Sequence, residues 1–216
     1  MNPRTHLVAQ LRALIETVRT ADLEEAASAG VDLGEIASQL QTLASQLLPH
    51  TVDAEPTQVG LRREIGRMNF DRARHITDGG ILDIFPYSPI IGELNPVAPP
   101  LSFWRDGSTV RGSGRIPTSL NGPPASVHGG LVAAILDELL GMAAVVAGVG
   151  GFTGTLTVRY LRPTPIATDL DLRAQVESVD GRKVMVTGQI ASEGQVCATA
   201  EATFIRPNFA TQPDPI

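Results

Sequence analysis

Apolar residues recur at helical spacing in the first part of the chain. One set falls on a single helical face: Leu7, Val8, Leu11, Leu14, Ile15 and Val18. A second set is spaced by 4, 3 and 4 residues: Ile36, Leu40, Leu43 and Leu47. Such spacing aligns side chains along one face of a helix, and the glycines at 30 and 34 mark a break. Residues 1–60 are therefore predicted to be an extension of two helices.

Helical periodicity stops between residues 61 and 100. Residues 61–75 carry five arginines, which favours a solvated linker over a phosphate-contacting patch. Residues 85–100 carry five prolines. Proline fixes φ and lacks a backbone N–H, so this density excludes a regular helix or a central strand. Residues 61–100 are predicted to be an arginine-rich linker followed by a long loop over the domain.

Period-two alternation begins at Leu101. Two strands are predicted around a hairpin turn at Asp106-Gly107. Four more alternating runs follow at 152–160, 170–176, 184–190 and 196–204, and turns at Asp180-Gly181 and Glu193-Gly194 separate the last three. Alternation places Thr153 and Thr155 on one strand face and turns Cys197 away from the core. Pro207 ends the last strand, and residues 208–216 are predicted to be a tail.

A helix of about residues 129–147 separates the first two strands from the other four. It is apolar on every side except at Asp137 and Glu138, which is typical of a buried helix. Two strands, a buried helix and an antiparallel meander predict an α+β domain over residues 101–207. In it, one curled antiparallel sheet wraps around a central helix.

The entry to this helix carries the candidate chemistry. A turn rich in glycine and proline leads into His128-Gly129-Gly130, so the first helical amides are suited to an anion or a developing oxyanion. Asp137 lies about two turns further on, too deep for an N-cap. A carboxylate on a buried helix must be paired or hydrogen-bonded, which is frequent at functional sites. Glu138 is interpreted as structural or solvent-reaching.

Composition narrows the function further. The net charge of −6 and a pI of about 5.2 argue against nucleic-acid binding, which needs clustered cations. The single Cys197 cannot form an internal disulfide, and no Cys/His cluster has zinc spacing. The start of the chain lacks a signal-peptide pattern, and the two adjacent carboxylates argue against a membrane span at 131–152. These features predict a metal-free cytoplasmic protein.

An extended motif gives a family resemblance. It comprises Gly-Pro-Pro-x-x-x-His-Gly-Gly at 122–130, then Asp137, Gly141 and Thr153, and Tyr-Leu-Arg-Pro-Thr-Pro at 160–165. With the order of elements, it resembles the hotdog-fold acyl-coenzyme A thioesterases of the PaaI and thioesterase-superfamily-member type. The resemblance covers about Leu101 to Pro207, and nothing is carried over to residues 1–60.

The resemblance implies thioester hydrolysis without a cofactor. The amides of Gly129 and Gly130 form the oxyanion hole, because glycine lets the backbone approach the substrate. Asp137 is the general base or the nucleophile, and these two routes stay open. Thr153 is preferred over Thr155 as the hydroxyl near Asp137. His128 is expected to orient the loop and to help polarise the carbonyl, and not to act as the base. Some relatives have an asparagine six residues before the histidine, where this chain has Gly122.

The resemblance also implies a homodimer or a dimer of dimers, with Asp137 from one copy facing the amide loop of the other. The acyl chain is expected between the two central helices, and helical spacing suggests Leu131, Ile135 and Leu139 as lining residues, with Thr155 as a further substrate contact. The acyl group and the carrier, coenzyme A or acyl carrier protein, stay open. The alternative function is a non-catalytic acyl-thioester or small-ligand binding module, since a fold alone does not fix function. A hydratase is disfavoured because its pattern of neighbouring histidines is missing.

Overall fold

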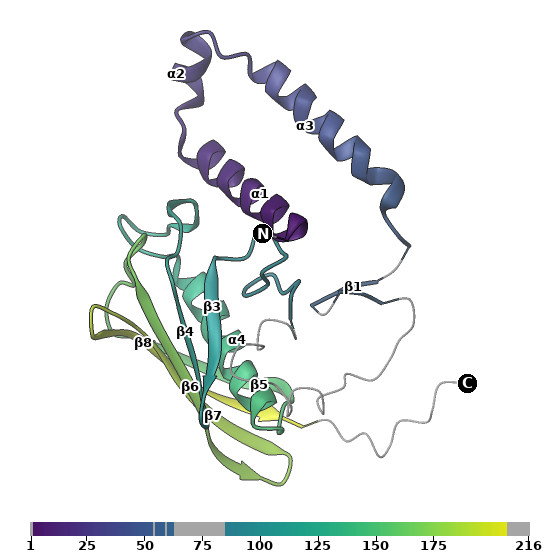
Figure 1. The fold of residues 1–216 in the computed structure, drawn as a ribbon. Coiled ribbons are helices and arrows are strands. Elements are labelled where there is room, and N and C mark those ends of the chain that lie inside the picture. The colour runs from purple at the N-terminus through teal and green to yellow at the C-terminus, as the bar shows by residue number, and fades with distance from the viewer. Residues whose placement is uncertain (1, 54, 59, 63–84, 207–216) are drawn as a thin grey trace.

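One curved antiparallel sheet and one central helix make up the larger part of the molecule (Figure 1). The computed structural model describes residues 2–53, 55–58, 60–62 and 85–206. The sheet has the strand order β3-β4-β6-β7-β8-β5. Its strands are β3 (Leu101–Asp106), β4 (Thr109–Gly114), β5 (Phe152–Tyr160), β6 (Leu170–Asp180), β7 (Lys183–Ser192) and β8 (Gln195–Ile205). The predicted α+β architecture is confirmed.

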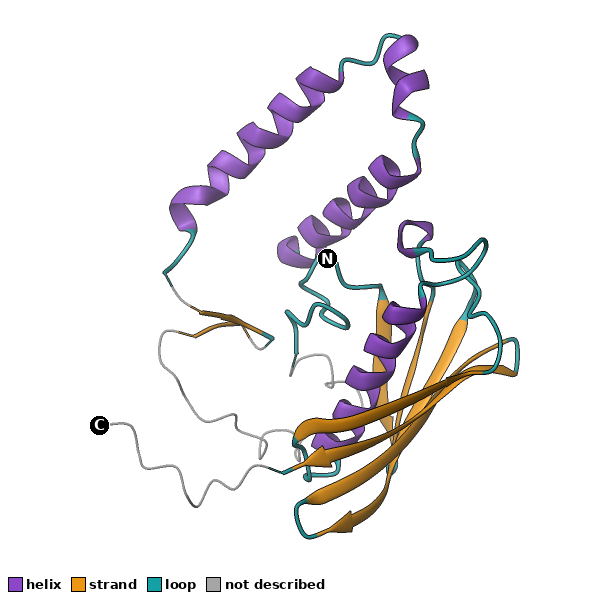
Figure 2. Cartoon of the chain, turned by 180° about the vertical axis from the view of Figure 1, so that it is seen from behind, coloured by secondary structure: helices purple, strands orange, loops and turns teal. Residues whose placement is uncertain are grey.

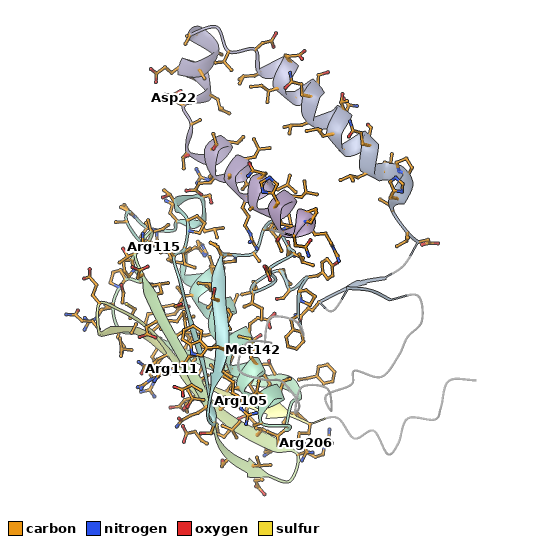
Figure 3. All side chains as sticks on the ribbon, viewed as in Figure 1. Asp22, Arg105, Arg111, Arg115, Met142 and Arg206 are labelled. Carbon is orange, nitrogen blue, oxygen red and sulfur yellow. The ribbon has the colours of Figure 1, made fainter. Side chains whose placement is uncertain are left out.

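Helix α4 (Gly129–Val146) lies along the concave side of this sheet (Figure 2). Its residues Leu136, Leu139 and Leu140 are completely buried, and they meet inward-facing strand residues such as Leu172 and Val186. Met142 of α4, labelled in Figure 3, is also buried and belongs to the same core cluster. By length and hydropathy alone α4 could cross a membrane, but 56% of it is buried inside the chain, as expected for the core helix of this sheet.

Two of the predicted hairpin turns are displaced by one residue. Asp106 pairs with Thr109 and Asp180 pairs with Lys183, so both aspartates still belong to the ladder. The loops therefore begin at Gly107 and at Gly181, whose φ angles are +62° and +55°. A two-residue hairpin needs a positive φ at its first position, which glycine adopts without strain. The third turn, Glu193-Gly194, is where the sequence placed it.

Cys197 is buried, so the prediction that it faces away from the core is wrong. In the pairing of β7 with β8, Ile190 is opposite Ala198 while Ala191 is opposite Val196. Cys197 is the extra residue of this bulge, and a bulge interrupts the alternation of faces. Its side chain is only 2% exposed as a result.

The amino-terminal part forms an arm of helices beside the sheet domain (Figure 1). It comprises α1 (Pro3–Thr20), α2 (Leu23–Ser28), α3 (Leu33–Leu47), a short 3-10 helix η1 (Leu48–His50) and the strand pair β1 (Glu55–Thr57) and β2 (Gly60–Arg62). The sequence missed α2, which is too short to show a stripe. Its N-cap Asp22, labelled in Figure 3, and Asp32 before α3 each accept backbone N–H bonds. Gly34 lies within α3 instead of in the break.

Helix α1 is attached to the sheet domain by polar contacts. The Arg12 guanidinium donates to the carbonyl oxygens of Gly92 and Asn95, both at 2.9 Å. The Glu16 carboxylate accepts the backbone N–H of Ser119 at 2.9 Å. The two Arg12 bonds tie the arm to the proline-rich loop 85–100, which contains turns and no helix or strand, as predicted. The Glu16 bond ties it to the 3-10 helix η4 (Thr118–Leu120), which follows β4. The predicted arginine cluster lies outside the described residues from residue 63 on, and so does the tail 208–216.

Candidate active site

His128 caps the amino terminus of α4. Its Nδ1 accepts the backbone N–H of Gly130 at 3.1 Å, and its own backbone is extended. This contact satisfies one of the amides that a helix start leaves open. The N–H of Gly129, the first helical residue, donates to no residue that the structure describes. Of the two amides predicted for the oxyanion hole, Gly129 therefore has the open donor, and Gly130 is held by His128.

A close backbone crossing positions His128. The His128 N–H donates to the carbonyl oxygen of Leu120 at 3.2 Å, and the Gly122 N–H donates to that of Ser126 at 2.9 Å. A Cβ on Gly122 would lie 2.7 Å from the His128 Cα, so only glycine allows this approach. The residue that replaces the asparagine of some relatives thus has a packing role here. The neighbouring Asn121 forms a bridge with Val127 and is exposed.

Thr153 and Asp137 are in direct contact. Thr153 Oγ1 donates to Asp137 Oδ1 at 2.9 Å, which joins the edge strand β5 to the middle of α4. A bulge at Gly154 explains this contact, because Thr153 pairs with Phe204 whereas Thr155 pairs with the adjacent Thr203. Consecutive residues of β8 point to opposite faces of the sheet. Thr153 therefore faces the helix, and the preference for it over Thr155 agrees with the geometry.

Three predicted placements are wrong. Thr155 does not share a face with Thr153, because of the bulge, and it lies on the outer side of the sheet with Thr157. Ile135 is 1% exposed and Leu139 is completely buried, so both pack against the sheet of their own chain and cannot line a slot between two helices. Leu131 is partly buried beside the core. Helical spacing indicates which residues share a stripe, but it does not indicate which stripe the sheet covers.

The face of α4 that the sheet leaves uncovered consists of small residues around Asp137. Its incompletely buried members are Gly130, Ala133, Ala134, Asp137 and Gly141. Three cavities of about 390, 320 and 340 Å³ lie elsewhere, and none of them is lined by Asp137, Thr153 or the residues His128 to Gly130. The first of these is on the outer face of the sheet, near Arg159 and Arg173.

Glu138 is a structural carboxylate. Its Oε1 accepts the Ser88 hydroxyl and the Gln58 side-chain amide, both at 2.9 Å. Ser88 is completely buried, so Glu138 fixes the proline-rich loop onto α4 immediately beside Asp137. Burial raises the pKa of Glu138 above its ordinary value, and the neighbouring Asp137 charge adds to this effect, while the hydrogen bonds from Ser88 and Gln58 oppose it.

Changing Glu138 to glutamine is expected to flatten the pH dependence of stability. Because the folded-state pKa of Glu138 is raised, its contribution is fully present below the ordinary value of 4.5 and is lost as pH rises through the raised pKa. Glu138→Gln keeps the accepting oxygen and removes the titration. Urea unfolding at a series of pH values should show wild type losing stability relative to the variant as pH rises. Parallel curves would contradict this, and Glu201→Gln, at an exposed position, is the control.

Tyr160 is the residue whose role sequence patterns did not reveal. Its hydroxyl donates to the carbonyl oxygen of Gly129 at 2.8 Å, so the far end of β5 contacts the helix entry. The only sequence signal for it was its place in the Tyr-Leu-Arg-Pro-Thr-Pro motif.

The described residues contain no group of three or more His, Cys, Asp or Glu side chains that could hold a metal ion.

Comparison with known proteins relates the domain to thioesterases. A sequence model of the thioesterase superfamily matches residues 125–199, from the helix entry into β8. Acyl-coenzyme A thioesterase THEM4 of Xenopus laevis is 38% identical over 86 residues, which are 40% of this chain and 39% of the relative. Acyl-coenzyme A thioesterase THEM5 of Homo sapiens is 29% identical over 86 residues, 40% of this chain and 35% of the relative. The matched segment thus spans well under half the length of these relatives.

One solved structure resembles the chain over almost its whole length. This thioesterase superfamily protein is 28% identical, with a TM-score of 0.77 over 94% of this chain and 91% of its own. The coverage includes the amino-terminal arm, to which the recognised motif does not extend. Together with the sheet wrapped around α4, these matches confirm the resemblance that the motif indicated: residues 125–199 belong to a hotdog domain of the thioesterase superfamily.

Proposed function

We propose that this protein hydrolyses acyl-coenzyme A thioesters to the free acid and coenzyme A. The observation that carries the proposal is the Asp137–Thr153 hydrogen bond on the uncovered face of α4, in a helix whose first amide is open. The named activity of the curated relatives, acyl-coenzyme A thioesterase, supports it. A module that only binds an acyl thioester does not need a carboxylate held by a hydroxyl at this place.

The two parts of the site have separate tasks. The Gly129 N–H, at the positive end of the helix dipole, stabilises negative charge on the thioester oxygen during attack. Asp137 takes a proton from the attacking water, or attacks the carbonyl carbon itself, and Thr153 holds its carboxylate in position. Breaking the C–S bond releases the thiolate, which takes up a proton. On the second route the acyl group is left on Asp137 as a mixed anhydride, which water then hydrolyses to regenerate the carboxylate. The products of either route are an acid and a thiol.

The Gly129 amide and the Asp137 carboxylate of a single chain are too far apart to act together on one thioester. Eight residues of helix separate Gly129 from Asp137, which at about 1.5 Å per residue is about 12 Å. Hydrogen-bonding and attacking groups need to be about 3 Å from the reacting atoms. We therefore propose that Asp137 of one copy works with the partner subunit's Gly129, in a homodimer or a dimer of dimers.

Strand β5 offers the contact surface for that partner. It is an edge strand nine residues long, with only β8 beside it among the described strands. Phe152, Tyr160 and Leu161 at its ends are 54–61% exposed. A long unpaired edge with exposed apolar side chains is suited to pairing with another strand. The small residues around Asp137 would then let the two copies of α4 approach each other closely.

Since the one cysteine is a free thiol, we propose a reducing compartment, the cytoplasm.

Free-thiol release from a panel of acyl-coenzyme A substrates tests the activity. The panel should cover short, medium and long aliphatic acyl groups and an aromatic one, with acyl carrier protein thioesters beside them. At least one substrate should be hydrolysed much faster by wild type than by Asp137→Asn. Equal rates for the two proteins on every substrate would leave the non-catalytic binding function instead.

Mixing two inactive variants tests the shared site. Asp137→Asn and Gly129→Pro each damage a different half, so a heterodimer has one site with both lesions and one site with neither. Co-expression with two different tags and tandem purification should give a heterodimer with about half the wild-type activity per dimer, far above either parent homodimer. A heterodimer as inactive as its parents would show that both halves act within one chain.

A further inference from the structure

A chain of hydrogen bonds runs from β5 to the cap of α4. The Tyr160 hydroxyl donates to the Gly129 carbonyl oxygen at 2.8 Å, and the Gly130 N–H donates to His128 Nδ1 at 3.1 Å. The Gly129 C=O and the Gly130 N–H belong to the same peptide group, which is planar. Tyr160 therefore fixes the orientation of the donor that holds the His128 ring.

This arrangement assigns the tautomer of His128. A neutral imidazole has one accepting nitrogen and one N–H. Because Nδ1 accepts from Gly130, the hydrogen of the neutral ring is on Nε2. The side chain is exposed, so this N–H is available to a ligand at the helix entry. Without the bond from Gly130, either tautomer could form.

We propose that Tyr160 is a positioning residue, which acts through the Gly129–Gly130 peptide to hold His128 with its Nε2–H as a second donor to the thioester oxygen. The inference rests on the proposed function. It adds a neutral side-chain donor to the open Gly129 amide. It also explains why the amide of Gly130, already engaged by His128, contributes through the ring instead of directly.

The packing around both glycines supports this arrangement. The Tyr160 ring lies over Gly129, where a Cβ would meet it at 3.8–3.9 Å. The His128 ring lies against Gly130, where a Cβ would meet Cε1 and Nδ1 at 3.2 Å, tighter than ordinary contact. Hydrogen bonds in series also polarise one another, so a donor on the carbonyl strengthens the N–H of the same peptide. Tyr160 is 54% exposed, so burial alone does not require its hydroxyl to be hydrogen-bonded to a protein group.

The test is Tyr160→Phe, which removes only the hydroxyl. We expect kcat on the preferred thioester to fall about fivefold with KM nearly unchanged, the effect of losing one neutral hydrogen bond. Tyr87→Phe is the matched control, because it removes the hydroxyl of the other tyrosine, which contacts Arg4. It should keep the wild-type kcat. An unchanged kcat in Tyr160→Phe, or a loss confined to thermal stability, would overturn the proposal.

A second measurement does not depend on turnover. In protein labelled with ¹⁵N-histidine, the wild-type His128 should show a protonated Nε2 and an accepting Nδ1. Tyr160→Phe should shift the Nδ1 resonance, and Tyr87→Phe should not. If Tyr160→Phe does not fold, 3-fluorotyrosine in the Tyr87→Phe background alters position 160 alone, and the same Nδ1 shift is expected. Unmoved His128 resonances would refute the positioning role of Tyr160. A moved resonance in a protein that hydrolyses no thioester would refute the proposed function only.

Discussion

Asp137→Asn is expected to lower kcat for thioester hydrolysis by about two to four orders of magnitude, the usual contribution of a positioned general base. Asparagine keeps an oxygen that can accept the Thr153 hydroxyl, so the contact between β5 and α4 should survive. Its amide cannot take a proton from water or form an acyl intermediate. Initial rates of thiol release at saturating substrate measure the effect, and circular dichroism and size-exclusion chromatography check fold and assembly.

Asp169→Asn is the matched control for this change. Asp169 is an exposed carboxylate that pairs with Arg115 at 2.6 Å and has no part in the site proposed above. The control variant should keep the wild-type rate. A near-normal rate in Asp137→Asn, with the fold intact, would remove Asp137 from the mechanism and leave its bond to Thr153 a structural contact.

Gly129→Pro is expected to lower kcat by about two to three orders of magnitude, because it deletes the open N–H of the oxyanion hole. The substitution is compatible with the fold at this position. Gly129 is the first residue of α4, where proline is favoured and a missing N–H breaks no helical bond. The preceding His128 has φ −58° and ψ 128°, the extended conformation that a residue before proline requires.

Gly129→Ala separates the loss of the N–H from the gain of a side chain. Its Cβ would lie 3.8 Å from the nearest Tyr160 atom, an ordinary contact, and its N–H stays in place. Alanine should therefore keep kcat within a few-fold of wild type while proline loses most of it. Equal losses in the two variants would attribute the effect to crowding at the helix entry. No loss in either would place the oxyanion donor elsewhere.

The sequence predicted the domain architecture because each of its elements has a strong local signal. Helix α4 is apolar all round, and four alternating runs separated by turns after it leave few ways to bury that helix. The recognised motif added the helix entry and Asp137, and the thioesterase superfamily match over residues 125–199 agrees with it. The amino-terminal helices were predicted from their stripes, but their attachment through Arg12 and Glu16 was not, because it joins residues about 80 and 100 positions apart.

The individual site residues were less predictable. Thr153 and Thr155 look equivalent by alternation, and the bulge at Gly154 that separates them depends on how β5 pairs with β8. Ile135 lies on an apolar stripe like its neighbours, yet the sheet covers it. The contact between Tyr160 and Gly129 crosses 31 positions and consists of one hydroxyl and one carbonyl, for which no periodicity gives a signal.

By itself the sequence determined the order and type of the elements, the buried helix with its two adjacent carboxylates, and the glycine-rich entry beside His128. Periodicity, turn residues and helix caps are local, so neighbouring residues are enough to specify them. The tertiary structure alone decided which threonine meets Asp137, which face of α4 stays uncovered, and that the Tyr160 hydroxyl reaches the Gly129 carbonyl oxygen at the helix entry. These depend on strand register and on close approach between distant segments, since a shift of one residue turns every following side chain to the other face.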